Sequence, residues 1–409
     1  MAINDMAQGG RGLAKLDGRP VFVPYTIPGE SVAAEITGRR GSALFARGVN
    51  LRAASADRVA PRCSHFGPGR CWECQWQHID YPAQLLLKQD VLADQLSRQG
   101  KLPDALIHAV MRPVLRAPEP WAYNHTLRLS RNQHGGWGLR RDGGGFEAIE
   151  ECLITHPDLL DLLAQLDLDY PPARRMALRR GSDGRLMLIF DVSAEEAPDL
   201  QTDLPLSVNL ILPDREPINL IGDAFSHYSI AGHDFRVTAG SSIRSNIAGV
   251  ELLVAQVIKA LQLRDGERAL DLYAGVGIFS AFLARRAALV TLVESYPPAV
   301  SDADANLQGR GNVDVIEGQV EAVLADMTDA GARYDVAVAD PPSAGLGQAV
   351  IQHLTKLGIE RLVYVSGDPA SLARDSRKLL DAGYQLRSVQ PIDLAPQTYY
   401  ISALATFER

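Results

Sequence analysis

Hydrophobic positions in the last third of the chain follow the alternating strand and helix pattern of an α/β domain. Apolar runs at 269–272, 288–293 and 334–339 predict buried strands, and apolar residues at helical spacing over 251–263 predict an amphipathic helix before them. Strands that alternate with helices are typical of a doubly wound parallel sheet. We therefore predict a Rossmann-like α/β domain over residues 236–409.

The N-terminal residues have a shorter period. Apolar and polar positions alternate over 22–30 and again over 31–36, with glycines between the short runs. This alternation predicts several short strands in a small β-barrel over residues 1–56.

The middle of the chain mixes both periods. Leucines at helical spacing after Pro82 predict a helix over 81–99 that ends at Gly100. Apolar runs at 176–180 and 186–192, joined by a glycine-containing turn, predict a hairpin. Further predicted strands are a pair within 123–141 and one at 207–212. We therefore predict a central α+β domain over residues 57–235.

The charge distribution changes the picture that the net charge gives. A formal net charge of −8 over 409 residues argues against nucleic-acid binding, yet residues 1–150 carry 19 Lys and Arg against 14 Asp and Glu. Such a basic front can present a cationic face to phosphates. Four arginines in the predicted barrel form either a phosphate-contacting set or an ordinary solvated face: Arg39, Arg40, Arg47 and Arg52.

No segment of the sequence predicts membrane insertion. The longest apolar candidate, 269–293, is interrupted by Arg285 and Arg286, and a span needs about 18 uncharged apolar residues or more. The first residues do not combine a basic region with an apolar block. We expect a cytoplasmic monomer that does not contact membranes.

Three of the four cysteines lie within twelve residues, at Cys63, Cys71 and Cys74, and the fourth is Cys152. In a reducing cytosol a Cys-x-x-Cys pair usually means metal or redox chemistry rather than a disulfide. Four thiolates suit tetrahedral zinc or a [4Fe–4S] cluster, and the spacing does not decide between them. A thioredoxin-like redox pair is a third option, although no matching strand–helix context precedes Cys71.

Side chains suited to S-adenosylmethionine (SAM) follow the predicted C-terminal strands. Gly275 and Gly277 form a turn where the backbone can approach a ligand closely, although nucleotide-binding Rossmann folds use similar turns. Glu294 ends the next strand, where a carboxylate can accept both ribose hydroxyls. Asp340 ends a third strand before two prolines, a pattern typical of methyltransferases that act on nucleic-acid bases.

Together these features resemble the iron–sulfur-containing RNA uracil-5-methyltransferases. The segments RVAPRC at 58–63 and CWECQWQH at 71–78 are similar to the family's cluster segment, and Cys152 matches its fourth cysteine. Trp72 and Glu73 replace a common Gly-Gly, which removes no ligand.

The resemblance implies a fold, two cofactors and an RNA partner. Residues 1–56 are expected to form a TRAM domain, an OB-like barrel that binds structured RNA such as rRNA or tRNA. The four cysteines are expected to hold [4Fe–4S] rather than zinc. The residues expected at the SAM site are Arg244, Tyr273, Gly275, Gly277, Glu294 and Asp340.

The side chains that carry uracil chemistry in that family are absent. The resemblance places the nucleophilic cysteine at Gly367 and the general base at Ser402, and it places Tyr400 where histidine is common. Ser343 replaces an arginine after the two prolines, and Arg244 replaces a glutamine that contacts SAM. Without a thiolate to add to C6, C5 of uracil is a poor nucleophile.

Two hypotheses follow. The protein is either a SAM-dependent RNA methyltransferase that modifies an already nucleophilic atom, with Asp340 as proton acceptor, or an RNA-binding protein that uses SAM and the cluster structurally without turnover.

Overall fold

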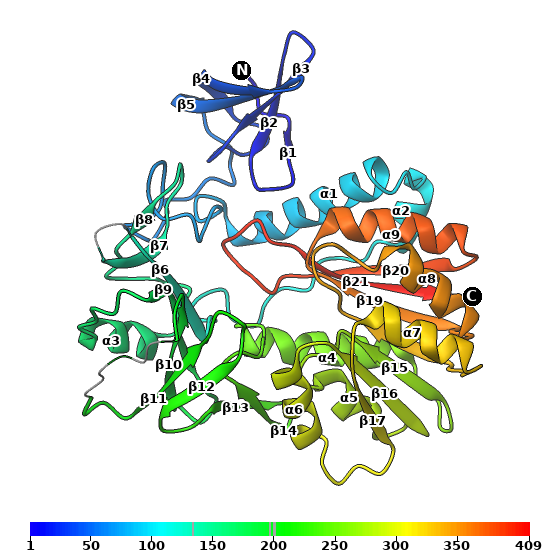
Figure 1. Ribbon diagram of the computed structural model, residues 1–409. Helices are drawn as coiled ribbons and strands as arrows, with labels where there is room; N and C mark the ends of the chain where they lie inside the picture. The colour runs from blue at the N-terminus through cyan, green and yellow to red at the C-terminus, as the bar shows by residue number, and fades with distance from the viewer. Residues whose placement is uncertain (133–134, 196–197, 199–201) are drawn as a thin grey trace.

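The computed structural model describes residues 1–132, 135–195, 198 and 202–409. Figure 1 shows three larger β-sheets, with the helices α1 (Tyr81–Arg98) and α2 (Asp104–Val110) running along the C-terminal one. The N-terminal sheet lies at one end, and the central and C-terminal sheets lie on either side of the molecule below it (Figure 1).

The N-terminal unit is a five-stranded sheet of order β1-β2-β3-β5-β4. Its strands are β1 (Asp5–Met6), β2 (Gly12–Leu16), β3 (Arg19–Val23), β4 (Ser31–Arg40) and β5 (Ala43–Ala53). A backbone bridge between Ala2 and Ser31 links the segment before β1 to β4, so the two edges of the sheet meet. The unit thus buries a small core of Ile3, Ala14, Val21, Val23, Val32 and Ala46.

The prediction of short strands is wrong for β4 and β5, which have 10 and 11 residues. Their outer halves are exposed, so the sequence there shows no alternation of apolar and polar residues that would predict a strand. Backbone pairing between the two strands, with three register shifts, extends them beyond the core.

Helix α1 (Tyr81–Arg98) confirms the helix predicted at 81–99 to within one residue. It contributes Val91, Leu92 and Leu96 to the same core as helix α9 (Pro369–Asp381) of the C-terminal unit. Helix α2 (Asp104–Val110) follows and adds Ile107 and Val110 to that core. Both helices therefore pack with the C-terminal sheet, although they lie within the predicted central domain.

The central unit is a seven-stranded sheet of order β12-β11-β10-β9-β6-β7-β8 with helix α3 (Pro157–Gln165). Its strands are β6 (Thr126–Arg131), β7 (Trp137–Arg140), β8 (Phe146–Glu147), β9 (Ala173–Arg180), β10 (Leu186–Val192), β11 (Leu206–Ile211) and β12 (Pro217–Ile221). The predicted hairpin is confirmed as antiparallel β9–β10, and the predicted strand pair as β6–β7. Residues 133–134 of that pair lie outside the described residues.

A separate hairpin of β13 (Phe225–Ile230) and β14 (His233–Thr238) leads into the C-terminal unit. Its Tyr228 and Phe235 are fully buried in a core shared with α4 (Ile247–Leu261), so the boundary predicted at 235/236 lies inside a strand that packs C-terminally. Helix α4 begins four residues before the predicted start because the Asn246 side chain caps it, accepting from the Gly249 amide at 2.9 Å.

The C-terminal unit is a seven-stranded sheet of order β17-β16-β15-β18-β19-β21-β20. Its strands are β15 (Arg268–Leu272), β16 (Leu289–Glu294), β17 (Val313–Glu317), β18 (Val336–Ala339), β19 (Arg361–Ser366), β20 (Gln385–Ile392) and β21 (Ser402–Glu408). The pairs among β15–β19 are parallel, as predicted, and β21 is antiparallel to both of its neighbours.

Helices cover both faces of this sheet, as the doubly wound pattern requires (Figure 1). Besides α4 they are α5 (Ile278–Leu283), α6 (Pro297–Asn306), α7 (Val320–Asp329), α8 (Gly347–Lys356) and α9 (Pro369–Asp381). The strand order reverses between β15 and β18, and the crevice at such a point is where open α/β sheets bind ligands. No helix in the described part of the chain is long and apolar enough to cross a membrane.

Candidate active site

The glycine turn after β15 is built as the sequence predicts. Tyr273, Gly275 and Gly277 have positive φ angles of 59°, 56° and 83°, which curl the backbone at the carboxyl end of the strand. A side-chain carbon placed on Gly275 would meet nothing within 4 Å, so this turn has open space beside it. The Tyr273 hydroxyl lies 3.5 Å from Glu321.

Glu294 lies beside this turn at the end of the neighbouring strand. Its Oε2 accepts a hydrogen bond from the Gly275 amide at 2.9 Å, and its Oε1 accepts from the amides of Ser295 at 2.7 Å and Tyr296 at 2.8 Å. These donors hold the carboxylate at the sheet edge, next to the glycine turn. The structure therefore brings Tyr273, Gly275 and Glu294 together, as predicted from the sequence.

A second carboxylate, Asp271, lies behind the turn and was missed in the sequence. It is fully buried, and its Oδ2 accepts from the Ser280 amide at 2.9 Å and the Ser280 hydroxyl at 2.7 Å. Its Oδ1 has no hydrogen-bond partner among the described residues. Burial raises the pKa of Asp271 to about 7. An acidic residue within the apolar run 269–272 is the sequence feature that could have identified it.

Arg244 and Asp340 form a two-pronged ion pair, with nitrogen–oxygen distances of 2.7 and 2.6 Å. The pair joins the segment before α4 to the end of β18. Burial alone would lower the pKa of Arg244, but the Asp340 carboxylate outweighs it and raises that pKa. Both carboxylate oxygens of Asp340 are therefore engaged by one guanidinium, and its role as proton acceptor stays a prediction.

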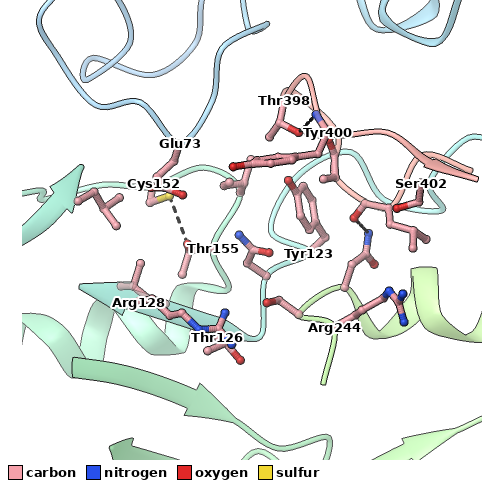
Figure 2. A pocket seen from close by; sticks show the side chains of 18 residues that line it. Glu73, Tyr123, Thr126, Arg128, Cys152, Thr155, Arg244, Thr398, Tyr400 and Ser402 are labelled. Carbon is pink, nitrogen blue, oxygen red and sulfur yellow. Dashed lines mark hydrogen bonds between the residues drawn. The ribbon is translucent and has the colours of Figure 1, made fainter. Parts of the chain in front are cut away.

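Beside this ion pair lies a cavity of about 470 Å³ between the central and C-terminal units. Figure 2 shows Arg244 and Ser402 on one side of it and Glu73 and Cys152 on the other, with Tyr123 and Tyr400 between. The predicted site residues that line it are therefore Arg244, Cys152, Ser402 and Tyr400. Glu73, Tyr123 and Arg128 also line it and were not predicted.

Gly367 follows β19 at the same sheet edge but does not line this cavity. Ser366 pairs with Ala403 in the antiparallel β19–β21 ladder, which sets Gly367 opposite Ser402. The positions that the resemblance gives to nucleophile and base are thus neighbours, and neither side chain can serve as a thiolate or carboxylate. A side-chain carbon at Gly367 would meet nothing within 4 Å.

Cys63, Cys71 and Cys74 line one small cavity together with Cys152, which lies far from them in sequence. All four are free thiols, and burial raises the pKa of each, with the nearby sulfurs of the others adding to the effect for Cys63, Cys71 and Cys74. Within the described ranges, no group of three or more His, Cys, Asp or Glu side chains is arranged as a ready-made metal site. The four cysteine side chains would all offer sulfur as the ligand atom. Thiolate ligands suit zinc and iron–sulfur clusters.

Comparisons with known proteins address the family directly. No family model matches the chain. An uncharacterized RNA methyltransferase of Halalkalibacterium halodurans is 31% identical over 100% of this chain and 96% of its own length. Another from Streptomyces avermitilis is 34% identical over 99% of this chain and 97% of its own.

A solved structure supports the fold. The crystal structure of Pyrococcus abyssi tRNA (uracil-54, C5)-methyltransferase with S-adenosyl-L-homocysteine matches 100% of this chain and 99% of that chain, with a TM-score of 0.74 and 22% identity. This match extends over the whole chain and shows that the two proteins share a fold. The chain belongs to the family of these RNA methyltransferases.

Proposed function

We propose that this protein binds SAM at the edge formed by β15, β16 and β18, and transfers its methyl group to an RNA atom that is nucleophilic without covalent activation. The observation that carries the proposal is the combination at one edge: a preserved glycine turn with Glu294 beside it, and no thiol at Gly367.

The SAM site is supported by the chemistry of its residues. Glu294 presents a carboxylate suited to ribose hydroxyls, and the turn at Gly275 and Gly277 leaves room for the cofactor to approach the backbone. Tyr273 and the Arg244–Asp340 pair complete the proposed contacts. When bound, SAM supplies an electrophilic methyl group; these side chains orient it toward the 470 Å³ cavity.

The acceptor is proposed to be a nitrogen rather than C5 of uracil. All four cysteines of the sequence converge on the small cysteine-lined cavity, and only Cys152 of them also borders the active-site cavity. The Ser366 hydroxyl is engaged with the backbone of Asp368 at 2.9 and 3.1 Å. A ring nitrogen or exocyclic amine attacks the methyl group directly, S-adenosylhomocysteine leaves, and one proton is released to solvent. Positioning beside the sulfonium is then the main catalytic contribution.

We further propose that the four cysteines hold a [4Fe–4S] cluster. Their convergence from positions 63–74 and 152 on one cavity, in a chain with no other cysteine, supports it. The cluster would tie the segment around Cys71 to the central sheet, which packs Cys74 and Cys152 in its core.

RNA is the proposed partner, with residues 1–56 as a TRAM domain, 57–235 as the cluster-bearing domain and 236–409 as the methyltransferase domain. The basic residues of the N-terminal sheet support this role. Arg39, Arg40 and Arg52 are exposed on β4 and β5, and Arg47 is exposed but paired with Glu35 at 2.8 Å. These strands are suited to phosphate contacts.

A second candidate is an RNA-binding protein without turnover. The Arg244–Asp340 pair favours it, since this pair neutralises the carboxylate at the sheet edge. The absence of a base at Ser402 points the same way.

The decisive experiment incubates the purified protein with isotopically labelled SAM and total cellular RNA, and resolves the product nucleosides by mass spectrometry. Label on a nitrogen-methylated nucleoside supports the proposal. Bound SAM with no transferred label supports the second candidate, and labelled ribothymidine contradicts both.

A further inference from the structure

The central sheet packs its main core on one face and carries arginines beside a small apolar cluster of Met187, Ile189 and Ile211 on the other. Alternate residues of β6, β9 and β10, among them Leu129, Met176 and Phe190, form the apolar core. On β6, Arg128 alternates with the core residues Leu127 and Leu129, and it pairs with Ala177, which sets it between the side chains of Arg175 and Arg179 on the neighbouring strand. Three guanidinium groups thus share one side of two adjacent strands.

Arg179 is buried, with 3% of its surface exposed, and forms no ion pair with a carboxylate of the described residues. Its guanidinium donates to the carbonyls of Val237, Thr238, Ala239 and Ser241 at 3.1–3.4 Å, so it holds the loop that leads from β14 toward Arg244. Its Nε has no partner in the described part of the chain. A buried cation is stabilised by nearby anions, and the buried Asp302 carboxylate is one anion that already acts on Arg179.

A cavity of about 390 Å³ opens over this face, lined by Arg128, Arg175, Arg179 and Arg215. The carboxylate in its lining is Asp191, which is already paired with Arg215 at 3.2 Å. Asp191 also lies directly opposite Arg175 across the β9–β10 ladder. The lining still holds four guanidinium groups against this one carboxylate, so the cavity carries a net positive charge.

This cavity adjoins the candidate active site. Arg128 lines both cavities, and the loop of Gly240, Ser241 and Ser242 that closes the second one continues directly into Arg244 and Ser245 of the first. Asp302, fully buried on α6, fixes this loop by accepting from the Ser241 hydroxyl at 2.7 Å.

We propose that the arginine cavity binds a backbone phosphate of the RNA strand whose target nucleotide occupies the active-site cavity. Because Arg128 lines both cavities, one RNA strand could place a nucleotide in the first cavity and a neighbouring phosphate in the second. A guanidinium group can donate two hydrogen bonds to the oxygens of one phosphate. This inference rests on the proposed function, since it takes RNA as the ligand.

The test compares Arg175→Gln with Arg174→Gln in the full-length protein. Both arginines are exposed on β9, but only Arg175 lines the cavity. Binding of a fluorescent, mixed-sequence single-stranded RNA is measured by anisotropy over a series of salt concentrations. Loss of one phosphate contact is expected to weaken binding about tenfold at low salt and to reduce the log–log salt slope by about 1.

Arg174→Gln is expected to bind within about twofold of wild type. Equal effects of the two substitutions would overturn the subsite, because the arginines would then act only through general charge. If wild type binds this RNA but transfers no label from SAM, the proposed activity fails while an effect specific to Arg175 still supports the subsite. Absence of RNA binding by wild type would overturn both.

Discussion

At the scale of single residues, the site combines preserved and missing groups. Glu294 lies beside the glycine turn, the arrangement expected for SAM, whereas Gly367 and Ser402, next to the last residue pair of the β19–β21 ladder, offer neither a thiol nor a carboxylate. The backbone around Gly367 is nonetheless compatible with a side chain, because an added carbon meets open space. The local fold is therefore compatible with a cysteine at this position.

Substitution Gly367→Cys is expected to insert a thiol without disturbing the fold. If the neighbouring cavity still accepts uracil, this variant should form a covalent adduct with RNA containing 5-fluorouridine, because the thiolate adds to C6. Denaturing gel electrophoresis detects the adduct. Gly367→Ser is the matched control and should give none; an adduct with wild type would mean that another group acts as nucleophile.

Asp271 is expected to make stability depend on pH. Its pKa of about 7 lies above that of an unfolded aspartate, so the folded state binds the proton more tightly, and the stabilisation is full below about pH 4 and lost as the pH rises through 7. Asp271→Asn should remove this dependence. Between pH 4 and pH 8 the free energy of unfolding of wild type should fall by up to ~4 kcal/mol relative to that of Asp271→Asn. Urea denaturation of both proteins at each pH measures this change. An unchanged difference would show that Asp271 titrates normally.

At the scale of elements, α1 and the segment before β21 are joined by a buried ion pair. Lys88 and Asp393 are 2.6 Å apart and nearly inaccessible to solvent, and Lys88 also donates to the Ala395 carbonyl at 3.0 Å. This segment supplies Leu394, Ala395, Thr398 and Tyr400 to the active-site cavity. The helix thus positions one wall of the site from outside it.

Removing one partner of this pair should be costly. Lys88→Met leaves a buried carboxylate without its cation, which is expected to lower the free energy of unfolding by about 3–5 kcal/mol. Combining it with Asp393→Leu should recover much of the loss, since the unpaired charge is then gone. Chemical denaturation of the two single variants and the double variant measures the coupling energy between Lys88 and Asp393. If the loss of unfolding free energy in the double variant equals the sum of the two single losses, the pair is not coupled and this prediction is wrong.

At the scale of the whole molecule, the cysteine cavity connects distant parts of the chain. Cys63, Cys71 and Cys74 precede α1, while Cys152 lies in the central unit. A cluster at this point would cross-link the two.

The proposed cluster predicts iron and acid-labile sulfide in equal amounts in protein purified without oxygen. Cys152→Ser should lower both and reduce the melting temperature, because a ligand from the central unit is lost. Thr155→Val is the matched control: it removes only the 3.2 Å hydrogen bond to the Cys152 sulfur and should keep the iron. Bound zinc in place of iron would contradict the cluster.

Local patterns predicted much of this architecture. The spacing of apolar residues predicted α1, the β9–β10 hairpin and the parallel strands β15, β16 and β18. It could do so because the buried faces of a helix or strand require apolar residues at regular positions. It missed the length of β4 and β5, whose exposed ends depend on backbone pairing, and the start of α4, which a single capping side chain sets.

The sequence by itself determined the residue types available for chemistry: the glycine turn, Glu294, the four cysteines and the absence of sulfur at position 367. Only the tertiary structure decided which of them meet. The Arg244–Asp340 pair, the shared cysteine cavity and the arginine face beside the active site each join residues separated by many positions in the chain. The reason is physical: periodicity reports whether a side chain is buried, while its partners are set by how whole elements pack.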